Sequence, residues 1–517
     1  MDKFKSIFEI LKFSKKTNLL KDLKYNNDWV SWDAEPWKNP WLDTENLTKI
    51  RDFSREFIAS DVDDMKNFDI NKLSISWTGN LANSAYMKCR ALRRAGHKCP
   101  IYLHPHDAPV IGHPVWEESS FVPANDELII NDAGHLIFNK KMKEAEGFSN
   151  VTNVFSFPVI NDWRKLIAEK KYKWVDPEKL KLFDPYFAYF ATLNEIQKSD
   201  VVWGASNGVY FPYLAKRPYV ASQTGGDLWY EASRGDMIGA LMRLSYANSR
   251  VILASNPWTF SHARRFGFKN AIYLPVVIDE THYTPGNSDQ RALWESSGGS
   301  FFVFSSGRLD NQVKGSSIGI NAFANFSKTC SEARLVLTTW GRDNNKLKNH
   351  IKKLGILNKT ILLPFSSKGM IREYLRSADV FLDQFVLGYY GSSGLEALAS
   401  GLPVIGRIEK NQYDCLCETG APPILNACCV EDVEKHLLKL YAEKNYLREV
   451  GLKSRDWFLQ NHSYQIWEKR MLSVLAATAE GKKTTFNRSV LSKRLTSIEK
   501  NYYKEELRRA PTFPNYE

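Results

Sequence analysis

The chain has 517 residues, of which 43% are apolar and 13% aromatic, and it carries a formal net charge of +12. This length exceeds what one hydrophobic core usually serves, and the apolar content excludes a disordered chain, so we expect a globular protein with two domains. The positive charge indicates an anionic partner, but the sequence has no helix-turn-helix, zinc-finger or RNA-binding signature, and we therefore expect no nucleic acid.

Residues 1–72 are predicted to form an N-terminal extension. Within it Phe4, Ile7, Phe8 and Leu11 recur at helical spacing with lysines beside them. Such a helix either lies at a membrane interface or packs on the protein's own surface, and both interpretations remain open. The start has no signal-peptide cleavage site, and seven irregularly spaced cysteines fit reduced thiols. We therefore expect a cytoplasmic protein, with peripheral contact at the inner face of the membrane under the first interpretation.

Residues 73–285 are predicted to form a Rossmann-like domain, because strands and helices alternate along them. The expected strands lie in KLSISW, KCPIYLH, DVVWGAS, PYVASQ, RVILAS and NAIYLP, with helices in SAYMKCRALRRAGH and around 232–247. Alternation of this kind predicts a parallel, doubly wound sheet.

A second α/β series over residues 298–455 follows a linker rich in glycine, proline and serine. Its expected strands lie in FFVFSS, ARLVLTT, TILLPF, DVFLDQF and LPVIG. A helical stretch at 456–480 is expected to return to the first domain, and 481–517 is predicted to be a basic tail. The fold class is therefore α/β, with two Rossmann-like doubly wound domains.

Two loops of the second domain carry the residues expected to bind a ligand. GYYGSSGLEALASGLPVIG (388–406) places small residues and free N–H groups at a helix start, as a phosphate site requires, although a plain structural turn remains open. Ser393 and Glu396 also match a helix capping box. GRLDNQVKG places Arg308 and Lys314 between a strand and a helix, where two cations can clamp a diphosphate, although taken alone the pair is more typical of a solvated loop.

The order of these segments resembles that of retaining GT-B glycosyltransferases, the family-four enzymes also called glycosyl transferases group 1. TGNLANSAYMKCRALRRAGH resembles the amino-terminal glycine turn and helix of that family, and TGGD (224–227) resembles its interdomain loop. The resemblance spans about 73–477. It implies two Rossmann-like domains facing a central cleft, a nucleotide-sugar donor, and no metal or other cofactor.

The resemblance also implies roles for individual residues. Arg308 and Lys314 would be catalytic, holding the donor's diphosphate and stabilising the leaving group, and Glu396 would bind the nucleotide ribose. The remaining donor-binding residues implied by the resemblance are Gly79, under the donor, and the loop of Gly391, Ser392, Ser393 and Gly394.

The sequence departs from the family at Gly388, where relatives carry a glutamate that touches the donor sugar. Asp383, Tyr389 and Tyr390 are predicted to take over part of that role. The departure keeps open a non-catalytic scaffold with the same fold.

Candidates on the acceptor side are His104 and Asp107 in YLHPHD, together with Asp227 in TGGD. For the histidines of that segment, an ordinary loop position is the favoured interpretation. Asp61-Val62-Asp63 imitates a metal-binding D-x-D motif but precedes the first core strand, so we expect helix surface there.

These expectations combine into one predicted function. The chain would move a sugar, with retention of configuration, from a nucleotide-sugar donor to a glycan, glycolipid or polyprenyl-linked acceptor in cell-surface polysaccharide or glycoconjugate synthesis. Transfer to a protein or a small molecule and the non-catalytic scaffold are the alternatives.

Overall fold

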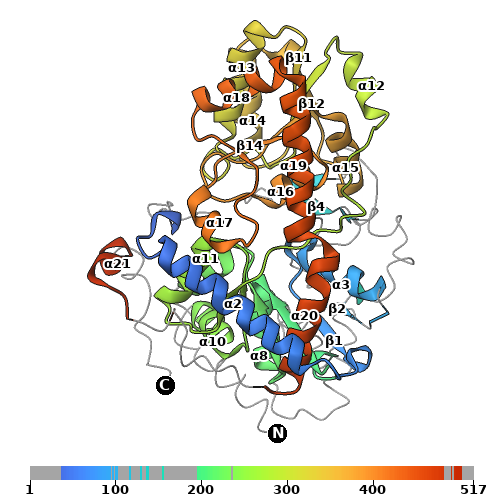
Figure 1. Ribbon diagram of the computed structural model, residues 1–517. Helices are drawn as coiled ribbons and strands as arrows, with labels where there is room; N and C mark the ends of the chain where they lie inside the picture. Colours follow the sequence, from blue (N-terminus) through green and yellow to red (C-terminus); the bar gives the residue numbers. More distant parts are fainter. Residues whose placement is uncertain are drawn as a thin grey trace, which may run out of the picture. The chain divides into compact units, whose positions relative to one another are not determined.

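The computed structural model describes residues 36–94, 96–97, 99–102, 116–117, 128–130, 136–138, 154–155, 195–233, 237–482, 491 and 494–503. The chain divides into two compact units, whose elements are labelled in Figure 1. Unit 1 comprises Met1–Asp107, Val151–Leu274 and Lys469–Glu517, and unit 2 comprises Ala108–Asn150 and Pro275–Glu468.

Unit 1 contains a seven-stranded parallel sheet in the order β5-β2-β1-β6-β7-β8-β9. Its strands are β1 (Ile75–Thr78), β2 (Ile101–Tyr102), β5 (Val154–Phe155), β6 (Val201–Ala205), β7 (Tyr219–Ser222), β8 (Ile252–Ala254) and β9 (Ala271–Tyr273). In chain order, β2 and β5 are added on one side of β1 and β6 to β9 on its other side, so the strand order reverses between β1 and β6. The parallel, doubly wound sheet predicted for this half of the chain is therefore confirmed.

The α-helices of unit 1 that the structure describes are α2 (Thr44–Asp64), α3 (Ser84–Arg94), α8 (Tyr210–Leu214), α9 (Gly226–Trp229), α10 (Met237–Asn248), α11 (Pro257–Arg265) and α21 (Ser497–Tyr502). All of them except α2 and α21 lie between strands of this sheet in sequence. Short 3-10 helices lie at Pro36–Lys38, Ile70–Lys72, Leu81–Asn83, Ser206–Val209 and Glu231–Ser233. The helix expected around 232–247 therefore begins five residues later, at Met237.

Helix α2 packs on β9 through a stripe of buried residues at helical spacing, which includes Ile50, Ser54 and Asp61. Ser54 Oγ accepts a hydrogen bond from the Tyr273 backbone N–H at 2.8 Å. Both Asp61 carboxylate oxygens accept from the Arg250 guanidinium, at 2.6 and 2.7 Å. The expectation that Asp61 lies on the helix surface is therefore wrong, because Asp61 anchors the helix through a buried ion pair.

A buried lysine, Lys88 on α3, lies against the sheet of unit 1. Its ammonium is 5.4 Å from the ring centroid of Trp203, which stacks on Trp77, and it donates to the Ser84 carbonyl at 2.9 Å. Burial lowers the pKa of Lys88 from 10.5 to about 8. Folding therefore disfavours the charged form, which weakens the native state wherever Lys88 is protonated.

We expect Lys88→Met to raise the free energy of unfolding at pH 7 by about 1–3 kcal/mol, since the gap between 10.5 and about 8 corresponds to at most about 3 kcal/mol. The penalty is full below pH 8 and disappears as pH rises to 10.5. Denaturant unfolding of both chains across this range should show that the difference between their free energies of unfolding decreases as the pH rises. A gap that widens, or a less stable variant at pH 7, would contradict this account.

Unit 2 contains a six-stranded parallel sheet in the order β12-β11-β10-β13-β14-β15. Its strands are β10 (Phe301–Ser305), β11 (Ala333–Thr338), β12 (Thr360–Leu363), β13 (Val380–Leu382), β14 (Val404–Gly406) and β15 (Leu425–Asn426). The antiparallel pair β3 (Leu128–Ile130) and β4 (Leu136–Phe138) lies apart from this sheet. The strand order reverses at β10, which pairs with β11 on one side and with β13 on the other.

The α-helices of unit 2 complete the second predicted series. Those in the described part of the unit are α12 (Gln290–Glu295), α13 (Ser316–Thr329), α14 (Asn344–Lys353), α15 (Lys368–Ser377), α16 (Ser392–Ala399), α17 (Lys410–Leu416), α18 (Val430–Ala442) and α19 (Lys444–His462), with a 3-10 turn at Leu357–Lys359. Helix α20 (Tyr464–Ala479) begins in unit 2 and ends in unit 1. Among the described residues, no helix is long and apolar enough to cross a membrane.

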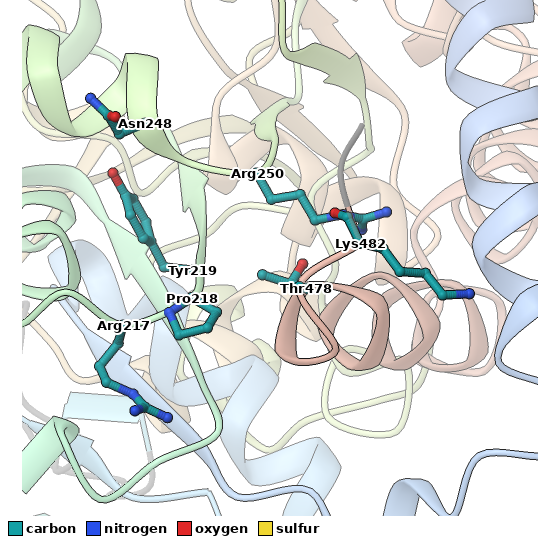
Figure 2. A pocket seen from close by; sticks show the side chains of 8 residues that line it. Arg217, Pro218, Tyr219, Asn248, Arg250, Thr478 and Lys482 are labelled. Carbon is teal, nitrogen blue, oxygen red and sulfur yellow. The ribbon is translucent and has the colours of Figure 1, made fainter. Parts of the chain in front are cut away.

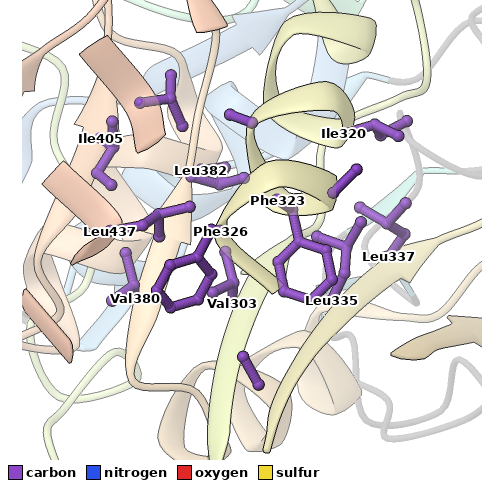
Figure 3. Packing of buried hydrophobic residues seen from close by; sticks show 14 of the residues in the cluster. Val303, Ile320, Phe323, Phe326, Leu335, Leu337, Val380, Leu382, Ile405 and Leu437 are labelled. Carbon is purple, nitrogen blue, oxygen red and sulfur yellow. The ribbon is translucent and has the colours of Figure 1, made fainter. Parts of the chain in front are cut away.

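The sheet of unit 2 is buried on both faces, which explains the continuous apolar run of β10. Phe301 and Val303 belong to the core formed with α13 and α18, part of which Figure 3 shows. Phe302 and Phe304 point to the opposite face, where both pack against Trp294 of α12. Alternate residues of one strand thus enter two cores, as expected for a doubly wound sheet.

Candidate active site

The two loops singled out in the sequence flank the point where the sheet of unit 2 reverses. Arg308 and Lys314 follow β10, and Asp383 and Gly391 follow β13, the strand that pairs directly with β10. Because the carboxyl ends of parallel strands meet at one edge, both loops leave the sheet from the same edge. This is the position at which open α/β sheets bind ligands.

Lys314 lies against the start of α16. Its Nζ donates to Gln384 Oε1 at 2.6 Å, and a Cβ built on Gly391 would lie 3.0 Å from the same nitrogen. Burial lowers the pKa of Lys314, and the nearby Asp383 carboxylate opposes this shift. Any residue larger than glycine at position 391 would therefore crowd the Lys314 ammonium group.

Asp383, the residue after β13, fixes the start of α16 through two hydrogen bonds. It accepts from the Gly391 N–H at 2.8 Å and from Ser393 Oγ at 3.3 Å, and a Cβ on Gly394 would come within 2.5 Å of its carboxylate. The helix begins at Ser392, and its N-cap residue makes no side-chain capping bond. The predicted capping box of Ser393 and Glu396 is therefore wrong, because Ser393 lies inside the first turn rather than at the N-cap and its hydroxyl donates to Asp383.

Arg308 and Tyr389 complete the group of side chains at this edge. The Arg308 guanidinium lies 3.5 Å from the Asp310 carboxylate and remains 30% exposed, so it is accessible to a ligand. Burial and the charge of Asp383 raise the pKa of Tyr389, and the charge of Arg308 opposes this rise. The structure thus brings Arg308, Lys314, Asp383, Tyr389 and Gly391 together.

Tyr390 is placed differently from its neighbour. Its hydroxyl lies 3.2 Å from His462 Nε2, and its ring packs against Tyr413 and Trp457. Burial lowers the pKa of His462 to about 4, so the imidazole is neutral near pH 7. Tyr390 therefore belongs to an aromatic cluster within unit 2, and its predicted contact with the donor stays a prediction.

Glu396 is buried on α16 and pairs with Lys368, the first residue of α15. This lysine was missed in the sequence, as was Gln384, whose amide nitrogen donates to the Tyr389 carbonyl. Gln384 directly follows Asp383 at a strand end, a position that could have marked it. Gly388 has no side chain to offer, and its carbonyl accepts from the Glu409 N–H at 2.9 Å.

In unit 1, Gly79 lies at the reversal point between β1 and β6. Its φ is +78°, and a Cβ there would overlap the Ala205 carbonyl oxygen. Asp227 is buried and accepts from the Thr224 N–H and the Tyr246 hydroxyl, and burial raises its pKa. Its predicted role with the acceptor stays a prediction.

The other two acceptor-side candidates, His104 and Asp107, lie outside the described residues. Within the described residues, no group of three or more histidine, cysteine, aspartate or glutamate side chains could hold a metal ion.

A separate hollow of about 370 Å³ lies in unit 1 at the amino end of β7 (Figure 2). Three cations line it, but Arg250 pairs with Asp61, Lys482 pairs with Asp64 at 2.9 Å, and Arg217 donates to the Ser199 carbonyl. This hollow lies at the opposite strand ends from Gly79. Because its cations already have partners, we assign it no ligand.

Comparisons with known proteins agree with this geometry. Residues 287–455 match the family model described as Glycosyl transferases group 1. A search of curated proteins found no significant match.

Three solved structures extend the likeness over most of the chain. HepE from Anabaena, crystallised with UDP-glucose, is 12% identical with a TM-score of 0.55, over 78% of this chain and 100% of its own. Sucrose-phosphate synthase from Thermosynechococcus elongatus is 12% identical with a TM-score of 0.50, over 80% and 99%. A glycosyltransferase from Rickettsia africae is 11% identical with a TM-score of 0.50, over 80% and 100%. The two Rossmann-like units therefore have the GT-B fold.

Proposed function

We propose that this glycosyltransferase, with its group 1 domain at residues 287–455, moves a sugar from a nucleotide-sugar donor to an acceptor with retention of configuration. The observation that carries the proposal is the position of Lys314 against the start of α16, with Arg308 in the same loop. Two cations and a helix N-terminus at one edge of a sheet suit a diphosphate. The UDP-glucose bound by HepE supports a donor of this class.

The chemical step asks the protein to stabilise a departing nucleoside diphosphate. As the bond from the anomeric carbon to the phosphate oxygen breaks, negative charge grows on that oxygen. Arg308 and Lys314 would face this charge in positions fixed before the reaction, which is the arrangement that lowers a barrier most effectively. The acceptor oxygen bonds to the anomeric carbon from the same face, and its proton passes to the departing phosphate, so no protein nucleophile is needed.

The remaining residues of the site would position the donor. Asp383 fixes the Gly391 N–H and Ser393, so the first turn of α16 is rigid before a ligand arrives. Glu396 would accept from the ribose hydroxyls while Lys368 holds its carboxylate. Tyr389 and Asp383 would take over the contact with the donor sugar that Gly388 lacks.

For the acceptor, we propose a glycan, glycolipid or polyprenyl-linked molecule in cell-surface polysaccharide or glycoconjugate synthesis. The net charge of +12 supports an anionic or membrane-bound acceptor. The amphipathic stretch that would contact a membrane lies outside the described residues. The missing side chain at Gly388 favours one second candidate, a scaffold that binds nucleotide without transferring sugar.

Calorimetric titration with UDP, GDP and ADP tests the donor site. We expect one nucleotide to bind the wild-type chain more tightly than the other two, and Lys314→Ala to weaken its binding about tenfold, because a charge-assisted contact to phosphate is lost. Lys328→Ala, at the exposed end of α13, is the matched control and should leave binding unchanged. Binding that is equal in all three chains would support the scaffold instead.

A further inference from the structure

Two residues from the first third of the chain are anchored on unit 2. Trp116 and Glu117 lie between β2 and β3 in sequence, yet they contact residues about 250 positions later. Both are buried, with 6% and 1% of their surfaces exposed. They contact the loop after β12 and helix α15, at the edge of the sheet that carries Arg308 and Lys314.

Trp116 lies on the loop that follows β12. Its ring stacks on Phe365 with centroids 5.8 Å apart and planes 14° apart. Its Nε1 donates to the Ser366 carbonyl at 3.1 Å. Lys368 Nζ lies 5.0 Å from the centroid of the same ring. A planar heteroaromatic ring is thus held by one stack and one N–H···O=C bond.

Glu117 fastens this segment to α15. Its carboxylate lies 3.4 Å from Arg372 Nη1 and 3.4 Å from the Tyr283 hydroxyl. The same arginine nitrogen donates to the Glu117 backbone carbonyl at 3.2 Å. Lys368 and Arg372, one helical turn apart, therefore pair with Glu396 and Glu117 respectively.

These contacts place Trp116 next to the carboxylate that we assign to the ribose. Lys368 touches both Glu396 and the Trp116 ring. A nucleobase is joined directly to its ribose, so a ribose at Glu396 brings the base to the side chains around Lys368. A base needs an aromatic face and backbone hydrogen-bonding groups, which here are Phe365 and Ser366, and Trp116 covers both.

The 365–367 loop is shielded from solvent in the structure, in which Trp116 lies on it. Phe365, Ser366 and Ser367 are 4%, 2% and 0% exposed. A base could not reach the face of Phe365 or the Ser366 carbonyl without moving the indole. The contacts of Trp116 are also the contacts that a base would make, so the two exclude each other.

We propose that the Trp116–Glu117 segment is an autoinhibitory self-ligand, which occupies the nucleobase subsite and must leave before the donor binds. The inference rests on the proposed function, because Glu396 locates the ribose. Only the fraction of molecules with the segment released binds donor, so the apparent affinity falls by that fraction.

The test is calorimetric binding of UDP, GDP and ADP to the full chain and to Trp116→Ala. Removing the indole abolishes its stack and its hydrogen bond, and we expect the dissociation constant of the bound nucleotide to fall about tenfold. Glu117→Gln, which keeps the indole but weakens its anchor, should lower it by a smaller factor. Adding Phe365→Ala to Trp116→Ala should raise it again, because with the indole already absent the base loses the ring on which it would stack.

Hydrogen exchange adds a readout that does not depend on affinity. Saturating nucleotide should speed exchange in the wild-type peptide that carries Trp116, and thermal unfolding should show that each variant is folded. Equal or weaker binding by folded Trp116→Ala would overturn this inference alone, since nucleotide would still bind. No nucleotide binding by either chain would contradict the inference together with the proposed function.

Discussion

Lys314→Ala and Arg308→Ala should each lower the kcat of sugar transfer by about 10²–10³-fold, the usual cost of removing one group that stabilises developing charge. Lys314 lies against the start of α16, and Arg308 remains partly exposed in the same loop. The loss should fall mainly on kcat, because the charge on the phosphate oxygen grows as the bond breaks. Steady-state kinetics of nucleoside diphosphate release measures it, and Lys328→Ala should retain wild-type rates.

The pH profile gives this prediction a second readout. The ammonium form of Lys314 is the one that stabilises the leaving group, and burial lowers its pKa. Activity should therefore fall as pH rises through that lowered pKa, below the usual lysine range. The same alkaline limb should be absent from Lys314→Ala. An unchanged limb, or a variant with wild-type kcat, would remove Lys314 from the mechanism.

Gly79→Ala should lower the free energy of unfolding by about 3–5 kcal/mol. Two penalties add at this position. The φ of +78° disfavours any residue with a Cβ, and that Cβ would overlap the Ala205 carbonyl oxygen at the reversal point of the sheet. Backbone of β1 or β6 must move to relieve the overlap. Denaturant unfolding measures the change.

Gly267→Ala separates the two penalties. Gly267 has a similar φ of +72°, but a Cβ there would meet no atom within 4 Å. We expect this control to lose only about 1 kcal/mol, the cost of the backbone conformation. If both variants lost the same amount, close packing at Gly79 would not be what requires glycine there.

The fold could be predicted because each half of the chain repeats a local pattern. Runs such as FFVF (301–304) are apolar throughout because alternate residues enter two cores, and this property can be read from the sequence of the run alone. The loops around Lys314 and Gly391 could be predicted for a similar reason. They follow strands directly, and parallel strands bring their carboxyl ends to one edge.

The rest depends on partners far away in sequence. Ser393 and Glu396 have the spacing of a capping box, but the Ser393 hydroxyl donates to Asp383, which follows β13, and Glu396 pairs with Lys368. Asp61 is charged like a surface residue, and only its partner Arg250, 189 positions later, explains why it is buried. The contact of Trp116 with the 365–367 loop leaves no local signal at all.

Product analysis from a donor screen tests the central claim most directly. The wild-type chain would be incubated with UDP-, GDP- and ADP-sugars, released nucleoside diphosphate would be quantified, and the anomeric configuration of the first-formed sugar product would be read by proton NMR. We expect one donor class to be turned over with retention, and Lys314→Ala to reduce nucleoside diphosphate release by about 10²–10³-fold. Nucleotide binding without turnover of any donor, or a product of inverted configuration, would contradict the account.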